Sequence, residues 1–328
     1  MVLCSGLLLS LGPAAVRQGR ATRAVSVATW NLEWLVSPET AHAGRLACRA
    51  GRRSALPCDV ALEQSRDSAD LARLARHARR VAADVFAFQE VENATIARRV
   101  FRHYDICIAP GKGLQHVGFA IRRGLPHRCG PPVDSLSLNG AQRPGLLLTL
   151  LPDSTAAIDL MVVHLKSGCA DAALPSKSSA CSLLARQADA LHQWLVEEAG
   201  RQPRFIVLGD FNRSDREPQR DLFWQTLAGG EASFSDAGAA IPFSNCHIGA
   251  PFSRAIDHVL VSRALEHALL AGGYRRFGYD ALEATRYRLS DHCPVRVSLI
   301  LPSTVPGPID GPALSSQPVG GASNVGIM

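Results

Sequence analysis

Short apolar runs recur along the chain, and several end in side chains that carry a carboxylate, an amide or an imidazole. The run 205–208 has the composition of a buried strand and leads through Gly209 into Asp210 and Asn212. Because residues two apart in an extended segment point to the same side, Asp210 and Asn212 can share one target, such as a metal-bound phosphate. A strand followed by an Asx turn is the structural alternative, since Asp and Asn favour turns.

Other predicted strands end in the same kind of side chain. A single histidine or carboxylate at a strand end is usually structural, so one such position would predict little about function. Repetition of the arrangement favours a shared site. The predicted strands, with the polar residues at or beside their ends, are 25–30 with Asn31, 83–89 with Glu90, 158–164 with His164, 255–261 with Asp257, and 295–301 with Asp291 and His292.

The remaining pattern predicts two helices and further strands. Apolar residues recur at helical spacing over about 59–83, with arginines on the opposite face, and again over 181–198. The arginines are typical of a solvated helix face. Residues from about 34 to 58 are polar and are predicted to form a loop. Gly and Pro separate the other predicted strands, at 104–109, 117–122 and 146–151, as antiparallel pairs require.

Strands outnumber helices, and the helices lie between strands that cannot all be parallel neighbours. This predicts an α+β protein in which two mixed β-sheets pack against each other with helices outside. We find no linker within 24–301 and predict one domain there. A chain of 328 residues with 47% hydrophobic content can bury a large core. The formal charge of +6 is compatible with a basic partner-binding face but does not demonstrate one.

The two ends of the chain differ from the predicted domain. Residues 3–11 are apolar and precede small residues, as in a secretory signal, although the usual basic region does not precede them. We predict 1–23 as a signal or N-terminal segment, with a plain apolar N-terminus as the alternative, and expect a secreted or periplasmic protein. The stretch is too short to span a membrane. Residues 302–328 are rich in Pro, Gly and Ser and are predicted to be disordered.

Cysteine usage also favours export. Apart from one cysteine in the N-terminal segment, the count is even. Cys48 with Cys58, and Cys169 with Cys181, bracket polar stretches that have little core of their own, and we predict both disulfides. Pairings among the other four stay open, with a buried free thiol as the alternative for Cys293. A zinc site is not expected, because no two cysteines have the tight spacing common in such sites.

Six short motifs together carry a family resemblance. In their order and spacing they resemble the endonuclease/exonuclease/phosphatase family, to which pancreatic deoxyribonuclease I belongs. The resemblance covers about residues 25–300 and implies a four-layer α/β/β/α sandwich of two mixed β-sheets flanked by helices. The motifs are Trp30-Asn31-Leu32-Glu33, Gln89-Glu90-Val91-Glu92-Asn93, His164-Leu165-Lys166, Gly209-Asp210-Phe211-Asn212, Ile256-Asp257-His258 and Ser290-Asp291-His292.

The resemblance implies metal-dependent cleavage of phosphodiesters. Such a reaction needs an in-line water, neutralisation of the developing charge and help for the leaving oxygen. Mg²⁺ is the expected cofactor, with Mn²⁺ or Ca²⁺ as alternatives, because hard cations of this kind neutralise phosphate charge and prefer oxygen ligands. The implied metal ligands are Glu90, Asn31 and Asp291.

The resemblance also implies roles for the other strand-end residues. His292 would act as general base, with its imidazole oriented by Asp257. Asp210 and Asn212 would position the attacking water and hold the phosphate. His164 would donate a hydrogen bond to a phosphate oxygen or to the leaving group.

Arg143, just before Pro144, resembles the family arginine that reaches the substrate phosphate, and a surface arginine is the alternative. The chain departs from deoxyribonuclease I at two points. Glu92 stands where that enzyme carries an arginine two residues after its metal glutamate. His164 has no obvious acidic partner between residues 104 and 125 except Asp105.

Three functions from different classes stay open. The first is a secreted Mg²⁺-dependent nuclease that cleaves DNA and RNA as a monomer, with nucleic acid as partner and without stable membrane insertion. The second is a phospholipid (sphingomyelin-type) or inositol-phosphate phosphoesterase, which would be expected to carry a hydrophobic membrane-seating loop; the sequence contains no convincing one. The third is a non-catalytic binding protein, disfavoured because competent residues stand at Glu90, Asp210 and His292.

Overall fold

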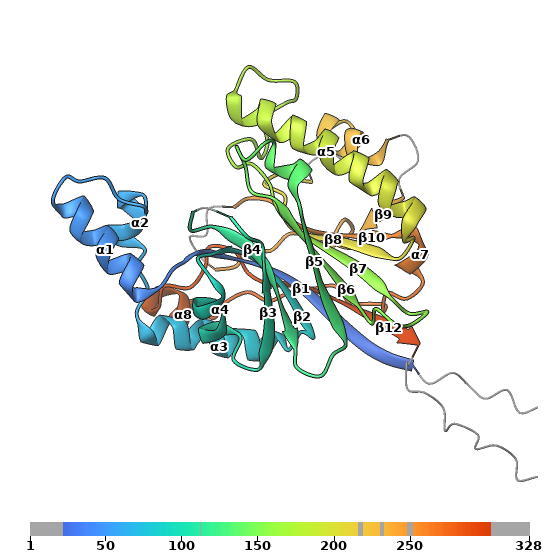
Figure 1. Cartoon of the computed structure of the whole chain (residues 1–328), viewed down its shortest axis with the longest axis horizontal. Helices are drawn as coiled ribbons and strands as arrows, with labels where there is room; N and C mark the ends of the chain where they lie inside the picture. The colour runs from blue at the N-terminus through green and yellow to red at the C-terminus, as the bar shows by residue number, and fades with distance from the viewer. Residues whose placement is uncertain (1–21, 112, 216–218, 230–232, 248–251, 303–328) are drawn as a thin grey trace, which may run out of the picture.

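The computed structural model describes residues 22–302 except 112, 216–218, 230–232 and 248–251. In it, two mixed sheets of six strands pack face to face, and helices lie outside them (Figure 1). The predicted α/β/β/α sandwich is therefore confirmed. Thr22 and Arg23, placed in the predicted N-terminal segment, already belong to the first strand. The rest of that segment, and the predicted tail from residue 303 onward, lie outside the described residues.

The first sheet has the strand order β11-β12-β1-β2-β4-β3. Its β1 and β2 run parallel, and its other neighbouring strands run antiparallel. The strands are β1 (Thr22–Leu35), β2 (Val85–Val91), β3 (Tyr104–Ile108), β4 (His116–Arg122), β11 (Arg275–Arg276) and β12 (Val295–Pro302).

The second sheet has the order β5-β6-β7-β8-β10-β9, and its single parallel pair is β7 with β8. It includes two strands that the sequence pattern did not predict, β5 and the three-residue β9. The Gly and Pro residues of β5 interrupt any apolar alternation. The strands are β5 (His127–Val133), β6 (Gly145–Leu150), β7 (Ile158–His164), β8 (Phe205–Asp210), β9 (Phe234–Asp236) and β10 (Asp257–Ser262).

Helices pack on the outer face of each sheet, and one pair of helices, α1 and α2, projects to one side (Figure 1). Residues of α3 and α4 share an apolar cluster with the first sheet, and residues of α5 and α6 share one with the second. The helices are α1 (Pro38–Arg49), α2 (Cys58–Glu63), α3 (Ser68–Val81), α4 (Ala94–Val100), α5 (Ser179–Arg201), α6 (Leu222–Ala228), α7 (Arg263–Glu266) and α8 (Ala281–Arg286), with a 3₁₀ turn at Asp134–Ser137.

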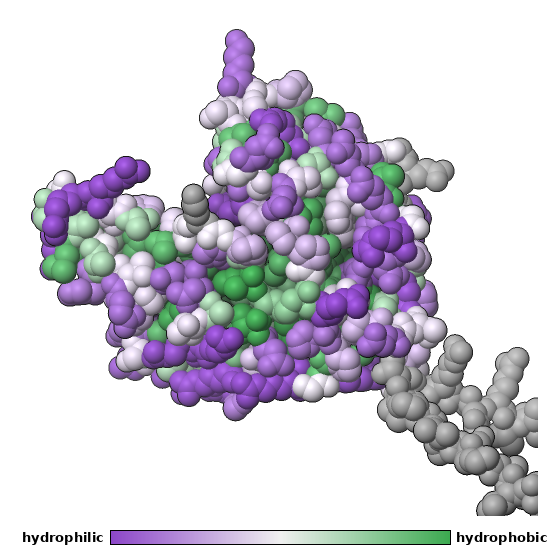
Figure 2. Space-filling model, viewed as in Figure 1, coloured by the Kyte–Doolittle hydropathy of each residue, from purple (hydrophilic) through white to green (hydrophobic). Residues whose placement is uncertain are grey.

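The alternation of side chains along β2 explains how one strand serves two interfaces. Val85 and Ala87 belong to the cluster between the sheets, whereas Phe86 and Phe88 belong to the cluster under α3 and α4. Successive side chains of a strand point to opposite faces, so a continuous apolar run is buried on both sides. On the face seen in Figure 2, hydrophilic residues cover most of the rim, and hydrophobic residues gather near the middle.

Two predictions about the N-terminal helices were wrong. The region predicted as a loop contains α1, which buries little besides Ala41 and Gly44 and therefore has no strong apolar period. The single helix predicted over about 59–83 is two helices, α2 and α3. They separate because Asp67 caps α3: its carboxylate accepts hydrogen bonds from the Ala69 and Asp70 amides.

Both predicted disulfides, Cys48–Cys58 and Cys169–Cys181, are present. The structure also pairs Cys107 with Cys129 and Cys246 with Cys293, across 22 and 47 residues of sequence. The alternative of a free thiol at Cys293 is therefore wrong. The Cys246–Cys293 bond ties the segment before β10 to the residue that follows His292.

The buried imidazole of His77 predicts a loss of stability in mild acid. Its Nε2 donates to the Phe277 carbonyl at 2.9 Å, and its ring lies against Trp30 and Tyr279. Burial, followed by the charge of Arg80, lowers the pKa of His77 from 6.5 to about 4. Between pH 6.5 and 4, the unfolded chain therefore binds more protons than the folded one. The free energy of unfolding is highest above pH 6.5 and falls by up to about 3 kcal/mol as the pH drops towards 4.

Urea unfolding at neutral and mildly acidic pH checks this expectation. His77→Gln can keep the hydrogen bond but cannot take up the proton, so its stability should depend less on pH than that of the wild type. His267→Gln, at an exposed position, is the matched control and should follow the wild type. Equal pH dependence in wild type and His77→Gln would contradict the assignment.

Candidate active site

The predicted strand-end residues meet at one edge of the sandwich. In the second sheet, Asp210 of β8 lies directly opposite His164 of β7 on one side and Asp257 of β10 on the other. In the first sheet, Asn31 of β1 lies opposite the residue before Glu90 of β2. Asp291 and His292 lie four and three residues before the first residue of β12, in the same sheet. Strand register thus brings together residues that are far apart in the sequence.

Irregular backbone in β2 directs the Glu90 side chain towards the site. The pairing of β2 with β4 shifts register between Phe88 and Val91, and Glu90 has a φ of 61°. A similar irregularity follows Asn31, where Glu33 and Trp34 also have positive φ. Such conformations cost about 1–3 kcal/mol each for non-glycine residues and concentrate at functional sites.

Asn31 connects the two sheets. Its Nδ2 donates to Asp210 Oδ2 at 2.9 Å and to Glu90 Oε1 at 3.2 Å, while its Oδ1 accepts from the Glu33 amide at 2.9 Å. The other oxygen of Glu90 accepts from the Trp34 amide at 3.0 Å. The Glu90 carboxylate is therefore held in one orientation, and the irregular segment after Asn31 supplies one of its partners.

The imidazole of His292 is oriented by a carboxylate from the opposite sheet. His292 Nδ1 lies 2.8 Å from Asp257 Oδ2, and Nε2 lies 3.8 Å from Asp210 Oδ2 and 3.9 Å from Asp291 Oδ1. The Phe252 ring packs against it, with 4.5 Å between ring centroids. Burial lowers the pKa of His292, but the Asp257 and Asp210 carboxylates outweigh burial and raise it well above its ordinary value. The two carboxylates thus stabilise the protonated, positively charged form of His292.

The backbone after β8 forms an Asx turn at Asp210 and Asn212. The strand ends at Asp210, and the Asn212 amide donates to Asp210 Oδ1 at 2.8 Å with a φ of 49° at Asn212. Asn212 Nδ2 donates to the Leu165 carbonyl at 3.1 Å. Burial raises the pKa of Asp210 to about 7, and the Asp257 carboxylate adds to the rise. Asp210 is thus a desolvated acid between Asn31, His164 and His292.

Among the described residues, no acid orients the His164 ring from its Nδ1 side. Its Nε2 lies 3.6 Å from both Glu90 Oε1 and Asp210 Oδ2, but its Nδ1 has no hydrogen-bond partner within the described part of the chain. Asp105, the acid considered from sequence, instead lies 3.7 Å from Arg123. Burial, followed by Arg143, lowers the pKa of His164 well below its ordinary value. The ring is therefore a neutral imidazole with Nε2 facing the site.

Arg143 lies beside His164 and is partly buried. Its Nε donates to the His164 carbonyl at 3.3 Å and its Nη2 to the Leu165 carbonyl at 3.0 Å, while Nη1 donates to Gln115 Oε1 at 3.2 Å. Burial lowers the pKa of Arg143, and the Glu90 and Asp210 carboxylates oppose that shift. The guanidinium is therefore held by the backbone carbonyls at the end of β7. There it is close enough to interact electrostatically with the site carboxylates.

Sequence reasoning missed Glu33 and Arg66. Glu33 Oε2 accepts from the Asp291 amide at 3.0 Å and pairs with Arg66 Nη2 at 3.4 Å. Arg66 also donates to the Leu289 carbonyl at 2.9 Å, and its side chain is 4% exposed, so it is not one of the solvated arginines predicted for this region. Glu33, two residues after Asn31, could have been found by the spacing rule applied to Asp210. Arg66 carries no comparable local signal.

The donor set fits a hard divalent cation. Glu90, Glu33 and Asp291 are the more accessible carboxylates of the site, with side chains 14%, 22% and 30% exposed. Burial, followed by Asp291, raises the pKa of Glu33 to about 7, and burial, with Glu90 adding, raises that of Asp291. A cation bound to carboxylate oxygens would relieve this concentration of desolvated negative charge. Asn31 could add the second lone pair of Oδ1.

The model of the Endonuclease/Exonuclease/phosphatase family matches residues 28–292, and the chain belongs to this family. Members are phosphoester hydrolases that generally use divalent metal ions. No curated protein matches the chain. The catalytic domain of human Nocturnin with bound sulfate has the same fold, at 15% identity and a TM-score of 0.56, covering 85% of this chain and 93% of its own.

Two solved structures with nucleic acid share this fold. TDP2 from D. rerio, complexed with a single-strand DNA product, is 16% identical with a TM-score of 0.53, covering 84% of this chain and 98% of its own. The 3′ phosphatase NExo from Neisseria, bound to a product DNA hairpin, is 17% identical with a TM-score of 0.55, covering 84% of this chain and 99% of its own. At these identities the likeness shows the fold.

Proposed function

We propose that the protein is a secreted, Mg²⁺-dependent phosphodiesterase of the deoxyribonuclease I type that hydrolyses DNA, and RNA as a second substrate. The observation that carries this proposal is the setting of His292. Its Nδ1 is held by Asp257, and its Nε2 is directed towards Asp210 and Asp291 beside the Glu90 carboxylate. An oriented base next to a carboxylate metal site is what water attack on a phosphodiester needs.

Each residue has a task in this proposal. His292 Nε2 takes the proton of the attacking water, and Asp257 stabilises the resulting imidazolium. Asp210 and Asn212 hold the water and the phosphate in line. The neutral His164 donates from Nε2 to a phosphate oxygen, and Arg143 contributes positive charge from the same side.

The metal ligands in this proposal are Glu90, Asp291 and Asn31. A bound Mg²⁺ would supply charge neutralisation at the phosphate. The two carboxylates come from segments on either side of β1 in the first sheet. Glu33 supports Asp291 by accepting a hydrogen bond from the Asp291 backbone amide. Glu33→Gln should therefore weaken metal binding less than Glu90→Gln does.

Pockets at both ends of the row of site residues support a polymeric substrate. The order β12-β1-β2-β4 places Asp291, Asn31 and Glu90 in sequence across the sheet edge. A pocket of about 440 Å³ begins at Asp291 and includes exposed Arg286 and Arg288. A second pocket, of about 420 Å³, begins at Arg143, next to the start of β4. A chain with its scissile phosphate at Glu90 could therefore extend in both directions.

The solved structures support nucleic acid as the substrate class, and the disulfides support export. Two of the solved structures with this fold hold DNA products, as described above. No helix among the described residues is long and apolar enough to cross a membrane. Four disulfides are typical of proteins that fold in oxidising compartments.

A substrate panel tests the proposal. The oxidised protein is offered plasmid DNA, RNA, sphingomyelin vesicles and the small diester bis(p-nitrophenyl) phosphate, with Mg²⁺ or with EDTA. We expect Mg²⁺-dependent cleavage of DNA and RNA, abolished by EDTA and reduced at least about 10²-fold in Glu90→Gln, which keeps the shape of the side chain but loses its charge. Release of lipid headgroup without DNA cleavage would instead establish the lipid phosphoesterase.

The pocket that includes Arg286 and Arg288 allows binding of the polymer to be tested separately from the chemical step. Arg288→Ala should raise KM for DNA several-fold and leave hydrolysis of the small diester unchanged, because only the polymer reaches that pocket. Arg128→Ala, at an exposed position on β5, is the matched control. Full activity of Glu90→Gln, or cleavage of every substrate in EDTA, would contradict the proposed mechanism.

A further inference from the structure

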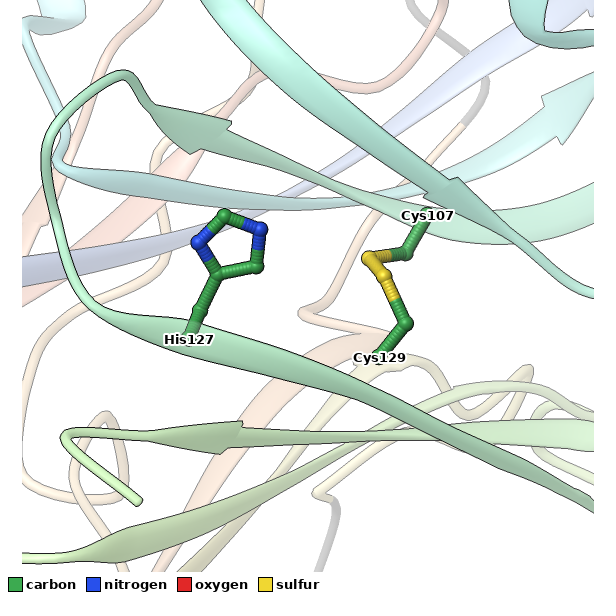
Figure 3. A group of neighbouring side chains, drawn as sticks. All are labelled: Cys107, His127 and Cys129. Carbon is green, nitrogen blue, oxygen red and sulfur yellow. A yellow bond between two sulfur atoms is a disulfide. The ribbon is translucent and has the colours of Figure 1, made fainter. Parts of the chain in front are cut away.

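Cys107, His127 and Cys129 form a cluster outside the candidate active site (Figure 3). The two sulfurs and one ring nitrogen of His127 all lie within 4.8 Å of one another. Cys107 is buried, His127 is half-buried and Cys129 is exposed. Two sulfurs and an imidazole nitrogen form a donor set that Zn²⁺ binds in proteins. In the oxidised protein the two sulfurs are joined as a disulfide, so neither is available as a thiolate ligand.

The cluster joins the two sheets. Cys107 lies on β3, an edge strand of the first sheet. His127 and Cys129 lie on β5, an edge strand of the second. Residues two apart on a strand point to the same side, which brings His127 and Cys129 together facing β3. The strand pairing of β5 with β6 is regular across both positions. The three donors are therefore held by sheet backbone.

His127 is oriented as a metal-binding histidine usually is. Its Nδ1 lies 2.8 Å from the Leu125 carbonyl, so Nδ1 carries the hydrogen and Nε2 keeps a free lone pair. Figure 3 shows the ring turned so that Nε2 is on the side of the two sulfurs. Metal-binding histidines almost always donate their other ring N–H to a carboxylate, a backbone carbonyl or water, which fixes the tautomer. A disulfide alone does not require an imidazole in this orientation.

We propose that opening the Cys107–Cys129 disulfide creates a zinc site made of the two thiolates and His127 Nε2. A dithiol reductant supplies two electrons and two protons, which convert the two bonded sulfurs to thiols while the reductant becomes a disulfide. Zn²⁺ then displaces the two thiol protons and binds both sulfurs and the imidazole. A water completes the tetrahedron on the solvent side of Cys129.

The change needs little movement. At a Zn–S distance of about 2.3 Å, two ligand sulfurs in a tetrahedral site stand about 3.8 Å apart, less than 2 Å further than in a disulfide of about 2.05 Å. Rotation of the exposed Cys129 side chain can supply most of this. The edge strands of the two sheets are then linked in both states, by a sulfur–sulfur bond when oxidised and through zinc when reduced. Cysteine spacing alone did not predict zinc here, because one of the three ligands is His127.

Cobalt binding tests the site without reference to hydrolysis. The protein is treated with a limiting amount of a phosphine reductant, which reaches the exposed Cys129 and Cys58 more readily than the buried pairs, and is desalted without oxygen. Titration with Co²⁺ should give a near-ultraviolet thiolate-to-cobalt charge-transfer band that saturates and is lost when Zn²⁺ is added. Carboxylate ligands of the candidate active site give no such band, so loss of nuclease activity and loss of this signal are separate results.

Matched variants locate the signal. Cys129→Ser should remove the band, and His127→Ala should weaken cobalt affinity at least about 10-fold, consistent with the loss of one of three protein ligands. Cys58→Ser removes the other accessible disulfide and should leave the band unchanged. The unreduced protein should show no band. A band that persists in Cys129→Ser, or an affinity unaffected by His127→Ala, would overturn the proposal.

A folding readout covers the case in which reduction loosens the protein. Circular dichroism follows the melting temperature of each reduced sample with and without Zn²⁺. We expect Zn²⁺ to raise the melting temperature of the reduced wild type and of Cys58→Ser, because a ligand that binds only the folded state stabilises it. An equal rise in His127→Ala would show that the metal binds elsewhere.

Discussion

His292→Asn is expected to lower kcat for plasmid DNA by about 10³-fold while leaving the fold and Mg²⁺ binding intact. The substitution removes Nε2, which faces Asp210 and Asp291, but keeps a side chain small enough for the buried position. Without a group to accept the proton of the attacking water, the residual rate depends on charge neutralisation and substrate positioning alone. KM should change little, because in the proposed mechanism His292 acts on the water and not on the distant parts of the substrate.

The matched controls separate base catalysis from general damage. His267→Asn, at an exposed position, should behave as the wild type. Asp257→Asn should reduce kcat in the same direction as His292→Asn, and combining the two should add little, because both remove one function. If His292→Asn keeps more than a tenth of the wild-type kcat, the proton acceptor is another group, and His164 becomes the first residue to test.

The sequence predicted which polar residues meet at the sheet edge better than it predicted the elements around them. Polar residues after apolar runs mark strand ends, and the ends of neighbouring strands meet, which is why Glu90 and Asp210 could be expected near each other without a structure. The roles of these residues and of His292, which precedes its strand, were implied by the family resemblance. The orientation of Glu90 could not be predicted. It depends on irregular backbone in two strands, and no local sequence pattern predicts the positive φ of Glu33 or Glu90.

The elements that the sequence missed lack a strong local signal. Helix α1 has too few buried positions to show a helical apolar period, and β5 contains glycine and prolines that are unusual inside a strand. Pairing of Cys107 with Cys129, and of Cys246 with Cys293, depends on which strands become neighbours. Short loops with little core of their own allowed Cys48–Cys58 to be predicted, whereas long-range pairing requires the topology.

Gly209→Ala is expected to prevent the formation of a stable fold, with a loss of at least about 4 kcal/mol in the free energy of unfolding. Gly209 has a φ of 153°, and a Cβ at this position would lie 2.0 Å from the Val163 carbonyl oxygen of the neighbouring strand β7. That oxygen belongs to backbone paired with Gly209 in the parallel register, so it cannot move aside as a flexible side chain could. The two strands would have to separate.

The separation would reach the active site directly. His164 and Asp210 follow Val163 and Gly209 on the same two strands, and their 3.6 Å approach depends on the close spacing that glycine permits. Any Gly209→Ala protein that does fold should therefore have low kcat as well as low stability. Gly200→Ala is the matched control, because its Cβ meets nothing within 4 Å on α5 and alanine favours helix by up to about 1 kcal/mol. Chemical unfolding of both variants checks the pair. Wild-type stability in Gly209→Ala would show that β7 and β8 can adjust, and the requirement for glycine in the Gly-Asp-Phe-Asn motif would then need another explanation.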